Sequence, residues 1–261
     1  MPASPRAFPL LPLGAITPEG WLRRQLEIQR DGLSGHLDEF WPDVARSGWI
    51  GGDSEGWERG PYWLDGALPL AYLLDDGALK KRVRHWVEEI LGRQAPDGWL
   101  GPELDAKYGY KYDPWPVFVT LKALTQYFEA EGDSRVIEAI TRFFKRLYAL
   151  LDTEPLQKWA QYRWGECVLS VLWLHERTGE DWLLALARKL HDQGFDWGAL
   201  FADYPYLDKR RREECVLATH VVNNAMAVKY PALWALVSGD EADRRLSARM
   251  IEALDRWHGQ V

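Results

Sequence analysis

Four short turns rich in glycine and acidic residues divide the sequence into a repeated pattern of two kinds of segment. Each turn follows a segment that is apolar nearly all round and precedes one that is apolar along one side only. A helix without a solvent-facing side is expected in the interior, whereas an amphipathic helix covers it. The turns recur at intervals of roughly fifty to sixty residues and lie at 75–77, 132–133, 179–181 and 239–241.

The segments before the turns therefore predict buried inner helices, and those after them predict half-exposed outer helices. In one outer segment Val136, Ile140 and Phe144 recur at helical spacing, and Ser134 is expected to cap its first turn. Strand patterns are almost absent. The predicted fold class is all-α, an alpha/alpha toroid or helical solenoid of paired inner and outer helices. The inner segments are 62–74, 117–128, 167–174 and 225–237.

Composition narrows the class of partner. Apolar residues make up 47% and charged residues 27%, as in ordinary globular proteins, and we expect one domain over residues 1–261. The net charge of −7 argues against nucleic acid and against a membrane surface as partner. No apolar stretch approaches the roughly 20 residues of a membrane helix. We expect a cytoplasmic protein with a neutral or weakly charged ligand.

The cysteines and histidines do not form a metal-binding pattern. Cys167 and Cys215 are too few for a disulfide framework, and there is no C-x-x-C or His-x-His cluster. We interpret both cysteines as buried small hydrophobes rather than nucleophiles. No metal and no cofactor is expected in this chain.

Fifteen tryptophans are several times the usual number. In a repeat of hairpins, the long connections from each outer helix to the next inner helix lie at one end. Sugar C–H faces stack on aromatic rings and carboxylates accept hydroxyl hydrogen bonds, so an aromatic and acidic rim predicts a saccharide site. A plain helical core is the alternative use of tryptophan. The rim residues are Trp99, Tyr108, Tyr110, Tyr112, Trp115, Trp159, Tyr162, Trp164, Trp197, Tyr204, Tyr206, Asp105, Asp113 and Glu166.

The stretch 49–65 leads into the first inner helix with glycines, aromatics and charges. One interpretation is a ligand loop that supplies Glu58, Arg59, Trp63 and Asp65 to a substrate. The other is a structural loop in which Glu58 or Asp65 pairs with Arg59. We favour the ligand loop, although buried ion pairs are common and indicate little by themselves.

Two acidic residues precede or begin later inner helices. Asp113 is followed by a proline and is expected to act as an N-cap. Glu166 begins an apolar helix, where the helix dipole favours a carboxylate while apolar surroundings raise its pKa. Glu166 is the best candidate for a general acid in this chain.

His220, Asn223 and Asn224 are spaced to share one face of the last inner segment. Polar groups in such surroundings need hydrogen-bond partners. Ligand hydroxyls or loop backbone could supply them, and we favour the ligand. Pro231 is expected to kink this helix or end its first half.

Four stretches, 12–43, 49–76, 92–102 and 219–241, resemble one branch of the beta-L-arabinofuranosidase-like glycoside hydrolases, family 127. They read PLGAITPEGWLRRQLEIQRDGLSGHLDEFWPD, WIGGDSEGWERGPYWLDGALPLAYLLDD, GRQAPDGWLGP and THVVNNAMAVKYPALWALVSGDE. The resemblance implies a six-hairpin alpha/alpha toroid, followed by beta domains, that acts on furanosides or related sugar linkages. Only four clear hairpins are present here, so we expect a domain truncated at its C-terminal end.

The resemblance also implies a glutamate general acid and a zinc-held cysteine nucleophile. Their motifs, Glu-x-Cys and a later cysteine pair, are not in this chain, so zinc is expected only in a full-length relative. Glu166 and Cys167 are adjacent and lie one hairpin too early, so those roles are not transferred to them.

Positions that the resemblance assigns to the substrate funnel are the loop from Glu58 to Asp65, Trp115, Glu166, and His220 with Asn223. The sugar-cleaving branch carries histidines at some of the inner-helix starts where this chain has Trp115 and Glu166. The expected function is that of a glycoside hydrolase whose chain supplies mainly the substrate-binding half. The alternatives are a non-catalytic saccharide- or protein-binding domain and, last, a sugar isomerase or epimerase. An exposed apolar edge predicts self-association.

Overall fold

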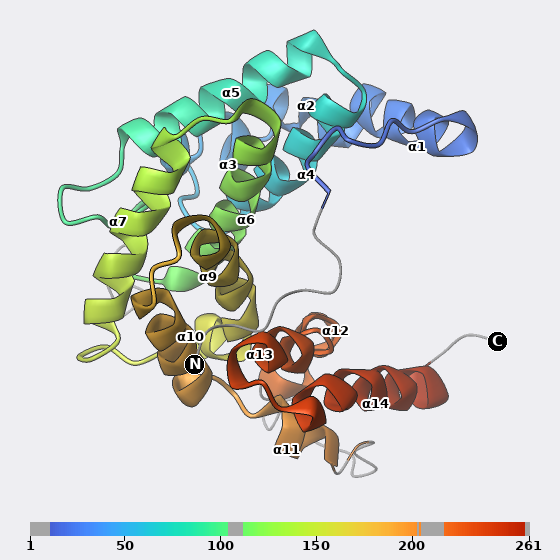
Figure 1. Cartoon of the computed structure of the whole chain (residues 1–261). Coiled ribbons are helices and arrows are strands. Elements are labelled where there is room, and N and C mark those ends of the chain that lie inside the picture. The colour runs from blue at the N-terminus through green and yellow to red at the C-terminus, as the bar shows by residue number, and fades with distance from the viewer. Residues whose placement is uncertain (1–10, 104–111, 203, 205–216, 259–261) are drawn as a thin grey trace. The chain divides into compact units, whose positions relative to one another are not determined.

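The computed structural model describes residues 11–103, 112–202, 204 and 217–258, and every regular element in these ranges is a helix (Figure 1). The predicted all-α class is confirmed. The chain divides into two compact units, Pro9–Leu147 and Tyr148–Val261, which we call the N-terminal and C-terminal units. Each is described by itself.

The N-terminal unit consists of two helical hairpins preceded by shorter helices. The hairpins pair α4 (Arg59–Leu73) with α5 (Gly77–Gly92), and α6 (Pro114–Glu131) with α7 (Arg135–Leu150). The last residues of α7, from Tyr148, are assigned to the C-terminal unit. The preceding elements are α1 (Gly20–Asp31), α2 (Leu33–Phe40), α3 (Pro42–Ala45) and the short 3-10 helix η1 (Gly48–Ile50).

The C-terminal unit repeats the hairpin arrangement. Helix α9 (Trp164–Thr178) pairs with α10 (Trp182–Gln193), and α13 (Tyr230–Ser238) pairs with α14 (Glu241–His258). Between and before them lie α8 (Lys158–Tyr162), α11 (Trp197–Ala202), η4 (Leu217–Thr219) and α12 (Val221–Ala227). All four hairpins predicted from the turns are thus present.

Local chemistry explains where these helices start and stop. Gly132, Gly179 and Gly239 each follow an inner helix with φ near +70°, a left-handed conformation that side chains with a Cβ rarely adopt. Asp76 caps α5, since its carboxylate accepts the backbone N–H of Leu79 at 2.8 Å.

Two predicted helix boundaries differ in their outcome. Pro231 lies in the first turn of α13, and the last inner segment is divided into α12 and α13 around Lys229, so the predicted break is confirmed. Ser134 directly precedes α7, but the backbone N–H of Arg135 is bound by the carboxylate of Asp133 at 3.0 Å.

Burial distinguishes α6 and α9 from the outer α5 as predicted. Helix α6 buries eleven of its eighteen residues on all sides, and α9 buries ten of fifteen. The outer α5 instead buries a single stripe at helical spacing: Leu79, Val83, Trp86, Val87 and Ile90. The last predicted inner segment is less buried than expected, since α12 buries two of its seven residues and α13 four of its nine. Polar groups on α6 and α9 are therefore placed by the surrounding core.

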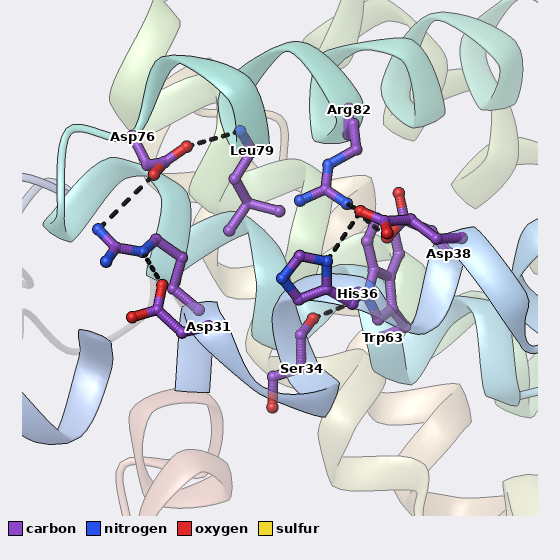
Figure 2. A network of polar contacts seen from close by, with 10 residues as sticks. Asp31, Ser34, His36, Asp38, Trp63, Asp76, Leu79 and Arg82 are labelled. Carbon is purple, nitrogen blue, oxygen red and sulfur yellow. Dashed lines mark hydrogen bonds and ion pairs between the residues drawn. The ribbon is translucent and has the colours of Figure 1, made fainter. Parts of the chain in front are cut away.

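Ion pairs join α1 and α2 to the first hairpin (Figure 2). Arg82 of α5 binds Asp38 at 3.0 Å and Glu39 at 2.8 Å, and Arg30 of α1 lies 3.8 Å from Asp76 at the start of α5. Partial burial raises the pKa of Asp38, although the nearby Arg82 opposes the shift. Helix α1 buries none of its residues, and of these pairs only Arg30–Asp76 involves it.

Candidate functional site

A group of indole rings and carboxylates lies where α4 and α6 begin. The Glu58 carboxylate accepts a hydrogen bond from Nε1 of the buried Trp115 at 2.6 Å. Asp113 accepts the backbone N–H of Trp115 at 3.0 Å and Nε1 of Trp57 at 2.9 Å. The predicted capping role of Asp113 is confirmed. We call Trp57, Glu58, Asp113 and Trp115 the indole–carboxylate cluster.

The cluster adjoins an open cavity of about 340 Å³ between α1, α2 and α4. Glu58, Arg59, Tyr62 and Trp41 are among its lining residues. Tyr62 is 38% exposed, and its ring centroid lies 6.2 Å from that of Trp115. A hydrogen-bonded carboxylate beside exposed rings is an arrangement that suits a polar ligand with an apolar face.

Arg59 is directed toward the loop before α4. Its Nη1 lies 3.0 Å from Asp43 and 3.7 Å from Glu55, so the alternative in which it pairs with Glu58 or Asp65 is wrong. Partial burial raises the pKa of Glu55, an effect that hydrogen bonding and the charge of Arg59 oppose.

Asp65 and Trp63 lie farther along α4 and contact other parts of the unit. The Asp65 carboxylate binds Lys122 at 2.8 Å and Gln126 at 3.0 Å, which joins the two inner helices. Trp63 is buried, packs against Trp86, and donates its Nε1–H to the carbonyl oxygen of Ser34 at 3.0 Å (Figure 2). Trp63 nevertheless lines the same cavity as Glu58, whereas Asp65 does not.

In the C-terminal unit Glu166 lies in the first turn of α9, as expected, and is nearly buried. Its carboxylate is ion-paired with Nζ of Lys229 at 2.6 Å and accepts a hydrogen bond from the Tyr230 hydroxyl at 3.2 Å. The sequence interpretation did not single out Lys229 or Tyr230. A lysine within an otherwise apolar inner segment, next to Pro231, is the signal that could have found the pair.

Arg163, one residue before α9, contacts both an asparagine side chain and a tryptophan ring. The buried guanidinium donates to Oδ1 of Asn223 at 2.7 Å and lies 4.5 Å from the ring centroid of Trp159. Asn223 is fully buried and donates to the carbonyl of Leu217 at 2.8 Å. Its amide is thus held by the protein itself.

His220 precedes α12 and packs perpendicular to Trp159, with ring centroids 5.2 Å apart. Its Nδ1 is buried and has no hydrogen-bond partner among the described residues. Asn224 donates to the carbonyls of Ala218 at 2.7 Å and of His220 at 3.0 Å. The two asparagines therefore use loop backbone, whereas His220 retains a buried polar atom that a ligand hydroxyl could satisfy.

Four expected rim residues lie outside the described residues, namely Tyr108, Tyr110, Tyr206 and Asp105, and so does Cys215. Cys167 is completely buried, and burial raises the pKa of its thiol well above the usual range. This confirms its interpretation as an interior side chain rather than a nucleophile.

The metal chemistry that the family resemblance implies does not fit the described residues. Within the described ranges, no group of three or more histidine, cysteine, aspartate or glutamate side chains is arranged to hold a metal ion. We therefore derive no step through zinc. In the same part of the chain, no helix combines the length and apolarity needed to cross a membrane.

Comparison with known proteins supplies the class. A family model described as beta-L-arabinofuranosidase, GH127 catalytic domain, matches residues 25–261. The chain belongs to this family of glycoside hydrolases, as the sequence resemblance indicated. Among curated proteins no match is found.

Proposed function

We propose that this chain binds a saccharide carrying a furanoside or related linkage and serves its hydrolysis. The family match supports the reaction class. The observation that carries the proposal is the buried, unsatisfied Nδ1 of His220 beside the ring of Trp159. A sugar hydroxyl would satisfy that nitrogen while a C–H face contacts the indole.

Glu166 is proposed as a ligand-binding carboxylate in the same unit. It is held by Lys229 and Tyr230, and a carboxylate has capacity for further hydrogen bonds from sugar hydroxyls. A general acid has to carry a proton, so the ion pair favours binding over acid catalysis. Family hydrolases that retain configuration use two positioned side chains, and we assign neither of these roles to a described residue.

The indole–carboxylate cluster is proposed as a second ligand-contacting region. Its charged oxygen atoms are oriented by indole N–H groups, and Tyr62 adds an exposed ring. We also propose that the chain forms an alpha/alpha toroid of inner and outer helices, the architecture that the family resemblance implies.

The direct test is hydrolysis and binding of nitrophenyl glycosides, beta-L-arabinofuranoside included, by this chain. Binding should weaken about 10-fold in His220→Phe, since one hydrogen bond to a buried polar group contributes about 1–3 kcal/mol. Phenylalanine keeps a ring against Trp159. The matched control is His175→Phe. His175 lies in the last turn of α9, and this variant should bind like the parent.

Two results would contradict the proposal. One is unchanged binding in a folded His220→Phe variant. The other is equal loss in His175→Phe, which would indicate a general stability effect. Absence of any saccharide binding by the parent chain would favour the alternative of a protein-binding helical domain.

We also propose self-association through the exposed apolar residues of the first two helices. Trp21 is 74% exposed, and Leu22, Ile28, Leu33 and Phe40 are exposed as well. Light scattering should report an oligomer that Trp21→Glu converts to monomer. A monomeric parent chain at micromolar concentration would contradict it.

A further inference from the structure

A separate cavity lies in the C-terminal unit, between the end of α10, α11, α13 and the start of α14. Its volume is about 410 Å³, and we call it the α10–α14 pocket. His191 and Trp234 stack in its wall with ring centroids 3.8 Å apart and planes 9° from parallel. Trp164 lies perpendicular to His191 at 5.2 Å. Ligand-sized space is thus bordered by aromatic rings.

Among the described lining residues of the α10–α14 pocket, three aspartates are not accompanied by any lysine or arginine. Asp192 lies in the last turn of α10, Asp196 in the connection after it, and Asp243 in α14. Carboxylates of one sign around low-dielectric walls focus a negative potential, which attracts a cation.

Most of the indole and hydroxyl donors among the described lining residues are already used by the protein. Trp164 donates its indole N–H to the carbonyl of Phe195 at 3.2 Å, and Trp197 donates to the carbonyl of Tyr162 at 2.9 Å. The Tyr230 hydroxyl donates to Glu166. Aromatic faces and carboxylates also suit a neutral sugar, but a cation gains in addition from the negative potential of the carboxylates. The occupant that fits best therefore brings its own positive charge.

We propose that the α10–α14 pocket binds a small alkylammonium compound. The apolar substituents lie against Trp234 and His191, where an aromatic face attracts a cation, and the charged nitrogen lies among the carboxylates of Asp192, Asp196 and Asp243. His220, Asn223 and Glu166 do not line this pocket. The proposal therefore does not depend on the proposed saccharide function.

The test uses choline and its uncharged analogue 3,3-dimethylbutan-1-ol, which have nearly the same shape. Each is titrated into the full chain, and binding is followed by tryptophan fluorescence and calorimetry. We expect choline to bind with an affinity that falls as salt rises, and the uncharged analogue to bind at least about 10-fold more weakly, within the range of a desolvated cation–aromatic contact.

Variants place the binding in the pocket. Trp234→Ala should weaken choline binding about 10-fold, and Asp243→Asn should weaken it several-fold. The matched controls on α14 are Trp257→Ala and Asp255→Asn, both exposed and outside the pocket, and these should bind like the parent. If Trp234→Ala fails to fold, as judged by circular dichroism, Asp192→Asn at an exposed position replaces it.

Three outcomes would overturn the proposal. The first is equal binding of choline and its uncharged analogue, which would mean that charge is not recognised. The second is no choline binding by the folded parent chain at millimolar concentration. The third is choline binding that Asp243→Asn and Trp234→Ala leave unchanged, which would locate the cation elsewhere.

Discussion

The two glutamates at inner-helix starts are held by different chemistry. Glu58 of the N-terminal unit accepts a hydrogen bond from the indole N–H of Trp115, whereas Glu166 of the C-terminal unit is ion-paired with Lys229. Trp115 is fully buried, whereas Lys229 is 44% exposed, and the buried Tyr230 also donates to Glu166. Glu58 is therefore held by a buried indole, and Glu166 is held by a charged partner together with a buried hydroxyl group.

This difference predicts how salt and mutation should affect each of the two regions. A hydrogen bond from a packed indole is lost only when the core is disturbed, so it should withstand salt. The partner of Glu166 reaches it on a flexible side chain, and a nearly buried carboxylate without its ammonium is costly. Mutations at the two regions should consequently differ in size and in salt dependence.

The largest effect is expected at Trp115. Trp115→Ala should reduce the free energy of unfolding by about 3–5 kcal/mol, because a fully buried tryptophan leaves a large cavity. Trp115→Phe should cost less, since it mainly removes the donor to Glu58. Urea denaturation measures both, with Trp257→Ala at an exposed position of α14 as a control that stays within about 0.5 kcal/mol. Equal losses of stability in the three variants would contradict the expectation that the buried Trp115 contributes more than an exposed tryptophan.

At Lys229 we expect an intermediate effect. Lys229→Met should cost about 1–3 kcal/mol, because the nearly buried Glu166 carboxylate loses its charged partner. Adding Glu166→Gln should recover part of the loss by removing the unpaired charge. Arg244→Met, which breaks an exposed pair with Glu241 in the same unit, should cost less than about 1 kcal/mol. A cost no larger than that of Arg244→Met would show that charge does not position Glu166.

The N-cap of α6 allows a smaller and more local comparison. Asp113→Ala should cost about 1 kcal/mol for the lost cap, plus the loss of the hydrogen bond from Trp57. Asp76→Ala removes a cap from α5 in the same unit without an indole partner. Thermal unfolding should therefore show the greater destabilisation in Asp113→Ala. The reverse order would mean that the indole–carboxylate cluster adds nothing.

The smallest effect should come from the ion pairs between α5 and α7. Hydrogen bonds from Arg135 lower the pKa of both Glu88 and Asp133. Carboxyls with depressed folded-state pKa values stabilise the fold above their unfolded pKa and lose that contribution as pH falls. Arg135→Gln should thus lower the urea midpoint slightly at pH 7. The difference should shrink below about pH 4, near the unfolded-state pKa values, and disappear as the pH falls through the depressed folded-state pKa values of Glu88 and Asp133. A difference that persists in acid would point to packing rather than charge.

The periodic features of this chain were predictable because they depend on neighbouring residues. Apolar spacing distinguished α6 from α7, turn glycines marked the ends of inner helices, and Asp113 before Pro114 indicated a cap. The break near Pro231 followed from the same local rules. Each of these features involves groups within about one or two helical turns.

Side-chain partners in the candidate sites were not predictable in the same way. Lys229 reaches Glu166 across sixty-three positions of sequence, and Arg163, which was not anticipated, holds Asn223. The ligand was expected to satisfy both asparagines, yet loop carbonyls accept their N–H groups. Of His220, Asn223 and Asn224, only His220 retains an unsatisfied buried nitrogen within the described structure.

The sequence by itself therefore determined the helices, their inner or outer character and the family of the chain, because periodicity, turns and motifs are properties of the chain order. Tertiary structure alone decided which carboxylate meets an indole, which meets a lysine, and where a cavity remains. The physical reason is that hydrogen bonds and ion pairs act over a few ångströms in space. Packing of distant helices brings such groups together, and no local spacing specifies the result.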